Sequence, residues 1–198
     1  MRDILSDALA VLRDGGTILY PTDTVWGIGC DATNPEAVAR IYEIKKRSDS
    51  KSLVLLASDM DMVAKYIKVI PSIAVDLVEV NDAPMTIIYP GAIAGKAGDA
   101  GDRWHLAWNT VAEDGSVGIR IPLMQWCKDL VFKLGRPIVS TSANISGEPT
   151  PVRFSEIPQA IKDAVDFVVP PSVDTQSTGK ASQILKVGLR GEIEIIRK

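Results

Sequence analysis

The chain has 198 residues, of which 46% are hydrophobic and 24% are charged, and its formal net charge is −3. This composition is typical of a soluble globular protein, and the length predicts a single domain over residues 1–198. The acidic balance argues against a protein that grips nucleic acid over a broad face, because such proteins are usually basic.

Helices and strands alternate along most of the chain, as judged from hydrophobic periodicity and capping residues. In chain order we expect a helix over 4–12, a strand over 17–20, a helix over 35–45, a strand over 53–57, helices after Asp59 and from Pro71 to about Val80, strands over 85–89 and 117–121, a helix over 123–134, and strands over 137–141, 165–169, 183–187 and 192–196. This alternation predicts an α/β fold with a mixed sheet.

The stretch 91–116 is the least regular part of the chain and contains five glycines. We expect a long loop or flap there. Its tryptophans, Trp104 and Trp108, either cover a cavity or anchor the loop to the body of the protein. His105, the only histidine, has no evident partners for catalysis or metal binding and is interpreted as a loop residue.

The cysteines and the N-terminal segment indicate the compartment. Cys30 and Cys127 lie far apart without metal-ligand spacing, so we expect two reduced, buried thiols and neither a disulfide nor a zinc site. Residues 1–12 contain charged side chains and no continuous apolar run, unlike a signal peptide. No apolar run approaches the length of a membrane span. We therefore expect a cytoplasmic protein without a membrane partner.

Two polar clusters follow predicted elements early in the chain. Residues 21–27, Pro-Thr-Asp-Thr-Val-Trp-Gly, form a hydroxyl-rich turn that could hold a small polar ligand, although a plain capped turn explains them as well. Lys45, Lys46, Arg47 and Lys51 lie at and beyond a helix end. These cations either face phosphates or form a solvated basic helix end. Taken alone, neither cluster establishes a binding site.

A third cluster comes directly after the predicted strand that contains Ile138 and Val139. It reads Ser-Thr-Ser-Ala-Asn-Ile-Ser-Gly over residues 140–147. A purely structural loop rarely needs so many short donors and acceptors at a strand end, where ligands of α/β sheets tend to bind. The cluster indicates a phosphate or nucleotide cradle, although the chain contains neither GxxxxGK[ST] nor GxGxxG.

Four motifs occur together over roughly residues 10–187. They are the segment 21–29, Lys45-x-Arg47, the Gly-Ile-Arg-Ile-Pro segment over 118–122, and Ser142-x-Asn144 within the third cluster. In order and approximate spacing they resemble the YrdC-like (Sua/YciO/YrdC) family, in its single-domain form. The resemblance implies a YrdC/RibB-like fold, in which a twisted mixed sheet flanked by helices surrounds a basic cavity.

The resemblance also implies an activity. Members are nucleotidyltransferases that form threonylcarbamoyl-AMP and pyrophosphate from L-threonine, bicarbonate and ATP, with Mg²⁺ accompanying ATP. A tRNA-modifying threonylcarbamoyl transferase complex then uses the product to make t6A in tRNA. By motif position, the implied catalytic residues are Lys45, Arg47, Ser142 and Asn144, the implied threonine-binding residues are Thr22, Thr24 and Arg120, and the implied ATP-binding residues are Arg47, Lys51, Ser116, Ser140, Ser142, Thr150 and Lys186.

Three alternatives stay open at this point. A concave basic face could accept double-stranded RNA or tRNA through phosphate contacts, without synthase activity. YrdC-like domains also occur in larger hydrogenase-maturation proteins that use carbamoyl phosphate, but those chains carry additional domains. A scaffold with a decayed pocket is the third alternative, and the retained Lys45, Arg47, Ser142 and Asn144 argue against it.

Overall fold

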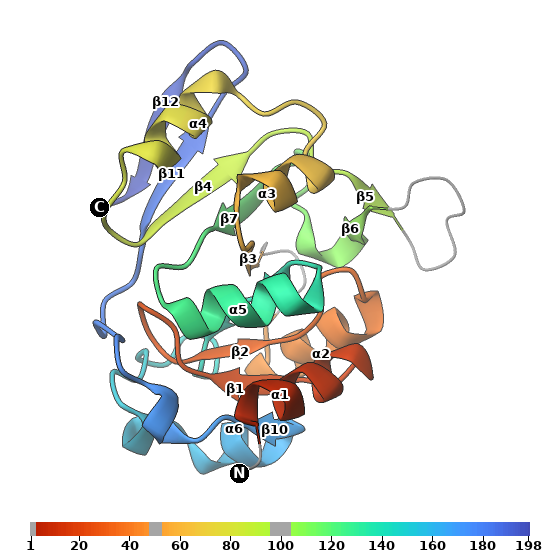
Figure 1. Cartoon of the computed structure of the whole chain (residues 1–198). Coiled ribbons are helices and arrows are strands. Elements are labelled where there is room, and N and C mark those ends of the chain that lie inside the picture. The colour runs from red at the N-terminus through yellow and green to blue at the C-terminus, as the bar shows by residue number, and fades with distance from the viewer. Residues whose placement is uncertain (1–2, 48–52, 96–103) are drawn as a thin grey trace.

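The structure is a computed structural model that describes residues 3–47, 53–95 and 104–198 (Figure 1). Its elements, in chain order, are α1 (Ile4–Arg13), β1 (Ile18–Tyr20), β2 (Gly27–Gly29), α2 (Pro35–Lys45), β3 (Val54–Leu56), α3 (Met60–Tyr66), α4 (Ser72–Glu79), β4 (Met85–Tyr89), β5 (Ala94–Gly95), β6 (Leu106–Ala107), η1 (Trp108–Thr110), β7 (Val117–Arg120), α5 (Gln125–Leu134), β8 (Ile138–Val139), β9 (Thr141–Ser142), η2 (Phe154–Glu156), α6 (Gln159–Ala164), β10 (Phe167–Val168), η3 (Pro171–Val173), β11 (Gln183–Val187) and β12 (Ile193–Arg197).

The fold is α/β, as predicted, and its strands form two larger mixed sheets. One sheet has the order β10-β1-β2-β9 and the other has the order β12-β11-β4-β7-β3-β8. Because β8 and β9 are separated only by Ser140, the chain passes directly from one sheet to the other. In Figure 1 the six-stranded sheet occupies the upper part of the molecule, the four-stranded sheet the lower part, and α5 runs across the middle.

The capping residues explain where α2 begins and ends. The Asn34 side chain accepts hydrogen bonds from the N–H groups of Glu36 and Ala37, and Pro35 occupies the first turn of α2. At its other end, Lys46 adopts the left-handed conformation with φ of 49°, which stops the helix. Directly after this turn, the Arg47 N–H donates to the carbonyl of Tyr42 (2.9 Å).

The structure confirms most of the predicted elements, corrects two of the predictions and contains elements that were not predicted. The predicted strand over 137–141 is two short strands in different sheets, because Ile138 and Val139 pair with β3 whereas Thr141 and Ser142 pair with β2. The stretch 91–116 contains β5, β6 and η1 rather than only loop. Strand β2 and helix α6 lie where no regular element was predicted.

Cys30 and Cys127 are free and buried, in agreement with the sequence. In the described part of the chain, no helix combines the length and the apolar character that crossing a bilayer requires. The core extends through both sheets and includes Tyr20, Trp26 and Tyr66, each at most 1% exposed.

A glycine in β2 permits the close approach of β1, β2 and β8. A Cβ at Gly29 would lie 2.7 Å from Cε1 of Tyr20 and would also clash with the carbonyl oxygen of Val139. We predict that Gly29→Ala lowers the free energy of unfolding by about 1–3 kcal/mol, as measured by urea denaturation.

Gly27→Ala is the matched control on the same strand, because its nearest contact would be 3.4 Å from Ser140 Oγ. Equal destabilisation by both substitutions would show that the close packing at Gly29 is not the cause.

Candidate functional site

A cavity of about 310 Å³ lies where the two sheets meet. The strand register explains why residues from separate strands share it: Arg120 on β7 is opposite Thr86 on β4, and Thr86 is opposite Ile184 on β11, so all three project from one sheet face. The described residues that line the cavity are Thr24, Val25, Gly27, Arg47, Val54, Arg120, Ser140, Thr141, Ser142, Thr150, Ala181, Ser182, Ile184 and Arg197.

The lining contains cations and hydroxyl groups. Arg47, Arg120 and Arg197 all line it, and no carboxylate occurs among the described lining residues. Arginine presents a rigid fork of N–H donors that suits phosphate and carboxylate oxygens. The cavity is therefore chemically suited to an anionic ligand that also accepts hydrogen bonds.

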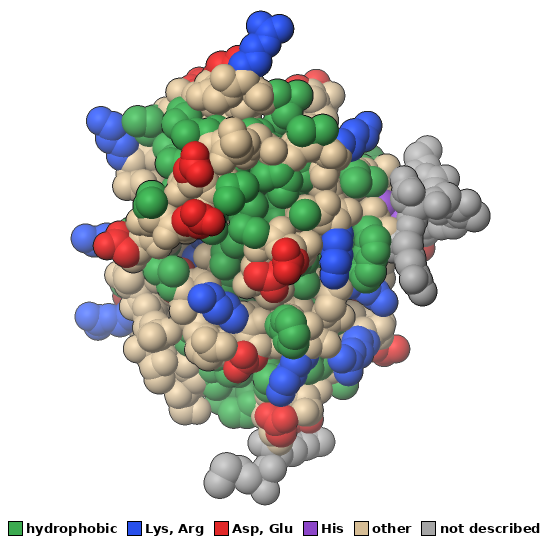
Figure 2. Space-filling view, turned by 45° about the horizontal axis from the view of Figure 1, so that its top comes forward, with side chains coloured by type: hydrophobic (Ala, Val, Ile, Leu, Met, Phe, Trp, Pro, Cys, Tyr) green, Lys and Arg blue, Asp and Glu red, His purple; other side chains and the backbone are tan. Residues whose placement is uncertain are grey.

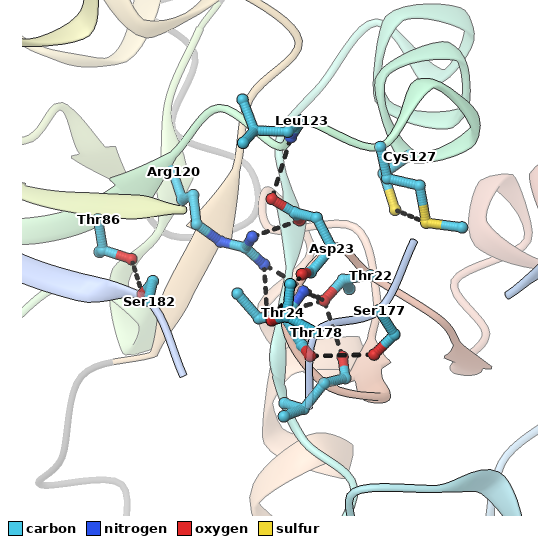
Figure 3. Close-up of polar contacts among 12 residues, drawn as sticks. Thr22, Asp23, Thr24, Thr86, Arg120, Leu123, Cys127, Ser177, Thr178 and Ser182 are labelled. Atoms are coloured by element: carbon cyan, nitrogen blue, oxygen red, sulfur yellow. Dashed lines mark hydrogen bonds and ion pairs between the residues drawn. The ribbon is translucent and has the colours of Figure 1, made fainter. Parts of the chain in front are cut away.

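A buried ion pair positions Arg120. Its Nη1 donates to Asp23 Oδ1, and each of the two side chains is at most 5% exposed. The second oxygen of Asp23 accepts from the N–H of Leu123 (3.1 Å), which fixes the carboxylate. Nη2 of Arg120 lies 3.2 Å from Thr24 Oγ1 and 3.4 Å from Thr22 Oγ1. Figure 3 shows the guanidinium held between the carboxylate and the two hydroxyl groups.

A segment from late in the chain holds the Thr22–Thr24 turn in place. The Gly179 N–H and the Ser177 hydroxyl both donate to the carbonyl of Thr24, at 2.7 and 3.0 Å. Close by, the indole N–H of Trp26 donates to Asp174 Oδ2 (2.8 Å). The Thr22–Thr24 turn, which a plain capped turn could explain from the sequence, is therefore held by hydrogen bonds from a distant segment of the chain. Figure 3 shows Ser177 and Thr178 beside it.

Lys45 joins the cationic segment to the third polar cluster. Its Nζ, on a residue that is 2% exposed, donates to the carbonyl oxygens of Ser142 and Asn144 (2.8 Å for Asn144) and to Asn144 Oδ1 (3.2 Å). Three N–H donors thus meet three oxygens. Asn144 Oδ1 also accepts from the Ser142 hydroxyl (2.6 Å), and Nδ2 donates to the carbonyl of Glu148 (2.7 Å). The Lys45 ammonium group therefore holds the Ser142–Asn144 loop in place through these hydrogen bonds.

Burial and the neighbouring guanidinium both act on Lys45. Desolvation, with a smaller contribution from Arg47, lowers the pKa of the Lys45 ammonium to about 8. Burial also lowers the pKa of Arg47, which stays cationic near neutral pH because the pKa of arginine starts so high.

Most of the site residues predicted from the sequence come together. Thr24, Arg47, Arg120, Ser140, Ser142 and Thr150 line the cavity. Thr22, Lys45 and Asn144 lie behind this lining, and their hydrogen bonds hold Thr24, Arg120 and Ser142 in place. Lys51 lies outside the described residues.

The structure does not bring Ser116 and Lys186 to this cavity. Lys186 is on the same sheet face as Ile184 but farther along β11, Ser116 immediately precedes β7, and Asp114 joins the two side chains. Its oxygens accept from Ser116 Oγ (2.5 Å) and from Lys186 Nζ (2.8 Å). Hydrogen bonds from Lys186 and Ser116 lower the pKa of Asp114 to about 2.

Sequence reasoning missed Asp23, Ser182 and Arg197. Asp23 was inside a recognised motif, and its position between two hydroxyl residues was a usable signal. No sequence motif marks Ser182 or Arg197 as a site residue, because only the pairing of β4, β11 and β12 brings them to the cavity. There the Arg197 Nε donates to the Ser182 carbonyl (2.9 Å), and the Ser182 hydroxyl is 2.7 Å from that of Thr86.

Comparison with known proteins extends this picture. The sequence model of the Sua5/yciO/yrdC family, described as "Telomere recombination", matches residues 10–198. The threonylcarbamoyl-AMP synthase of Chromohalobacter salexigens is 31% identical over 166 residues, which cover 84% of each chain. The threonylcarbamoyl-AMP synthase of Xanthomonas euvesicatoria pv. vesicatoria is 33% identical over 168 residues, 83% of this chain and 84% of the relative.

Solved structures share the fold. P. abyssi Sua5 complexed with L-threonine superposes with a TM-score of 0.79 at 23% identity, over 92% of this chain and 50% of that one, so this chain corresponds to about half of the P. abyssi protein. E. coli YciO superposes with a TM-score of 0.75 at 22% identity, over 98% of this chain and 88% of that one. On the extent of the family match and the identity to the curated relatives, the chain belongs to the Sua5/YciO/YrdC family.

Proposed function

We propose that the protein is an L-threonylcarbamoyladenylate synthase, which forms threonylcarbamoyl-AMP and pyrophosphate from L-threonine, bicarbonate and ATP. The observation that carries this proposal is the convergence of the Lys45–Arg47 segment with the Ser140–Asn144 segment at one cavity lined by three arginines. The curated relatives named threonylcarbamoyl-AMP synthase support this activity over RNA binding without catalysis.

The reaction needs positioned charge rather than a strong base. Bicarbonate gives CO2 and hydroxide, the threonine amine attacks CO2 to form a carbamate, and the released amine proton leaves with the hydroxide as water. The carbamate is already anionic, so its oxygen can attack the α-phosphorus of ATP while pyrophosphate leaves. The site must align these two groups and stabilise the negative charge on the phosphates. In the proposal Arg47 neutralises phosphate charge, and the hydroxyls of Ser140 and Ser142 donate to phosphate oxygens.

The amino acid would bind at the opposite wall of the cavity. Arg120, held by Asp23, points its Nη2 toward Thr24 and offers the donors that a carboxylate requires. Thr24 supplies a hydroxyl group beside it. Arg197 and Ser182 extend the polar lining, and Lys45 acts as a positioning residue because its hydrogen bonds are directed at the Ser142–Asn144 loop.

Mg²⁺ would enter with ATP, bound to the phosphate oxygens. Among the described residues, no group of three His, Cys, Asp or Glu side chains is placed to hold a metal ion. The product would pass to a tRNA-modifying threonylcarbamoyl transferase complex in the cytoplasm.

Arg47 provides the first test. We predict that Arg47→Ala lowers threonine- and bicarbonate-dependent pyrophosphate release by about a hundredfold, because charge on the phosphates is no longer neutralised, and that thermal stability changes little. Arg40→Ala, on helix α2, which ends shortly before Arg47, removes a cation from an exposed ion pair with Asp166 and should leave the rate near that of the wild type. Unchanged release in Arg47→Ala would reject the assigned role.

Asp23 tests the amino-acid site. With Asn at position 23, Arg120 loses its counter-charge and its fixed orientation. We predict that Asp23→Asn raises the KM for threonine by about tenfold, equivalent to ~1.4 kcal/mol of binding free energy, with a smaller change in the KM for ATP. Asp166→Asn serves as the control at a distant carboxylate. Equal increases in both KM values would argue for general distortion.

Lys45 gives the activity a pH dependence. Its pKa of about 8 is below the usual value of 10.5, so the ammonium is protonated at neutral pH and loses a proton as the pH rises through about 8. The neutral amine has two hydrogens for three oxygens, and its lone pair faces a carbonyl oxygen. We predict that turnover at saturating substrate falls across this range.

Lys45→Arg is the control variant, because an arginine does not lose its proton here. Its turnover should start lower but should not decline between pH 7 and 9. A decline of the same size in this variant would assign the pH dependence to another group.

A further inference from the structure

A short irregular segment, residues 174–179, lies against the turn between β1 and β2 (Figure 3). We call it the strap. The N–H and the hydroxyl group of Thr178 donate to the Asp23 carbonyl at 3.3 and 3.2 Å, and the Ser177 hydroxyl donates to the Thr24 carbonyl at 3.0 Å. A further strap N–H donates to the same Thr24 oxygen (2.7 Å). The strap therefore satisfies backbone acceptors of the turn that supplies Thr24 to the cavity.

The hydrogen bonds at the Thr24 carbonyl also fix the side chain of this residue. Two donors on one oxygen set the orientation of the peptide unit that follows Thr24, and the backbone torsions of the residue are set with it. Its Oγ1 is then held 3.2 Å from Nη2 of Arg120 and 2.9 Å from Oγ1 of Thr22. Movement of the strap would release the hydroxyl group that the synthase proposal places beside the amino acid.

Asp174 is the first residue of the strap, and both of its carboxylate oxygens accept hydrogen bonds. Oδ2 accepts from the indole N–H of Trp26 (2.8 Å), and Oδ1 accepts from the Ser177 N–H (3.2 Å). The indole is a fixed donor, because Trp26 is 1% exposed and its ring centroid lies 4.8 Å from that of Phe154. Hydrogen bonds to a charged acceptor are stronger than neutral ones. The carboxylate thus joins the core to the strap residue whose hydroxyl group bonds the Thr24 carbonyl.

Asp174 acts through other residues and not on the substrate itself. It is not among the described residues that line the cavity, and it borders a separate hollow of about 360 Å³. We propose that Asp174 is a positioning residue for the amino-acid substrate: its two hydrogen bonds hold the strap, and the strap holds Thr24 in the orientation that threonine binding requires. This inference rests on the proposed synthase function and assigns the residue that supports its amino-acid site.

The test compares the two substrates in one assay. Initial rates of pyrophosphate release are measured with threonine varied at saturating ATP and bicarbonate, and then with ATP varied at saturating threonine and bicarbonate. We expect Asp174→Ala to raise the KM for threonine about fivefold, because both hydrogen bonds that hold the strap are lost, and to change the KM for ATP less than about twofold. Asp174→Asn keeps one acceptor oxygen and should give an intermediate value. Asp163→Ala, at an exposed carboxylate on α6, is the matched control.

A double-mutant cycle shows whether Asp174 acts through the strap. Ser177→Ala removes the hydroxyl group that bonds the Thr24 carbonyl, and we expect the double variant to raise the KM for threonine by less than the product of the two single effects. If circular dichroism shows that Asp174→Ala does not fold, Asp174→Asn replaces it in the same comparisons.

Three results would overturn the proposal: an unchanged KM for threonine in the folded Asp174 variant, equal increases in the KM values for threonine and ATP, or a double variant whose effect equals the product of the single effects. A wild-type protein that releases no pyrophosphate would overturn the synthase function itself, and this inference with it. Failure of the inference alone is therefore distinguished by an active wild type.

Discussion

The arrangement of the site depends on one buried cation. The Lys45 ammonium is taken out of water at the end of α2, and a charge in that position requires oxygen partners. It finds them in the Ser142–Asn144 loop, nearly a hundred residues later in the chain. This constraint joins a helix end to a strand end in the other half of the sequence. As a result, Ser142 and Arg47 both line the cavity.

A second buried charge pair has the same character. Asp23 and Arg120 are both 3% exposed. Asp23 lies in the turn between β1 and β2 of the four-stranded sheet, and Arg120 lies on β7 of the six-stranded sheet. Removing one partner of such a pair leaves a buried charge uncompensated, which is strongly unfavourable. The two sheets are therefore connected by the Asp23–Arg120 ion pair as well as by the direct passage of the chain from β8 to β9.

The site also explains why a protein with a net negative charge can bind an anionic substrate. Cations that face the cavity act at short range in a partly dehydrated space, whereas the formal charge of −3 is a property of the whole chain. On the face shown in Figure 2, lysine and arginine side chains are scattered among acidic and apolar ones rather than gathered into one patch. On this face, such a distribution does not form the broad basic surface that grips a nucleic acid duplex.

The sequence by itself determined the α/β class, most helix and strand positions, and the residue types of the site, because periodicity, caps and short motifs are local properties. It could not place Ser182 and Arg197 at the cavity, or show that Ser116 and Lys186 meet at Asp114 instead, because strand pairing decides these positions. Nor could it show that Lys45 holds a loop in place. That role depends on which oxygens burial leaves within reach of the ammonium, and only the tertiary structure decides this.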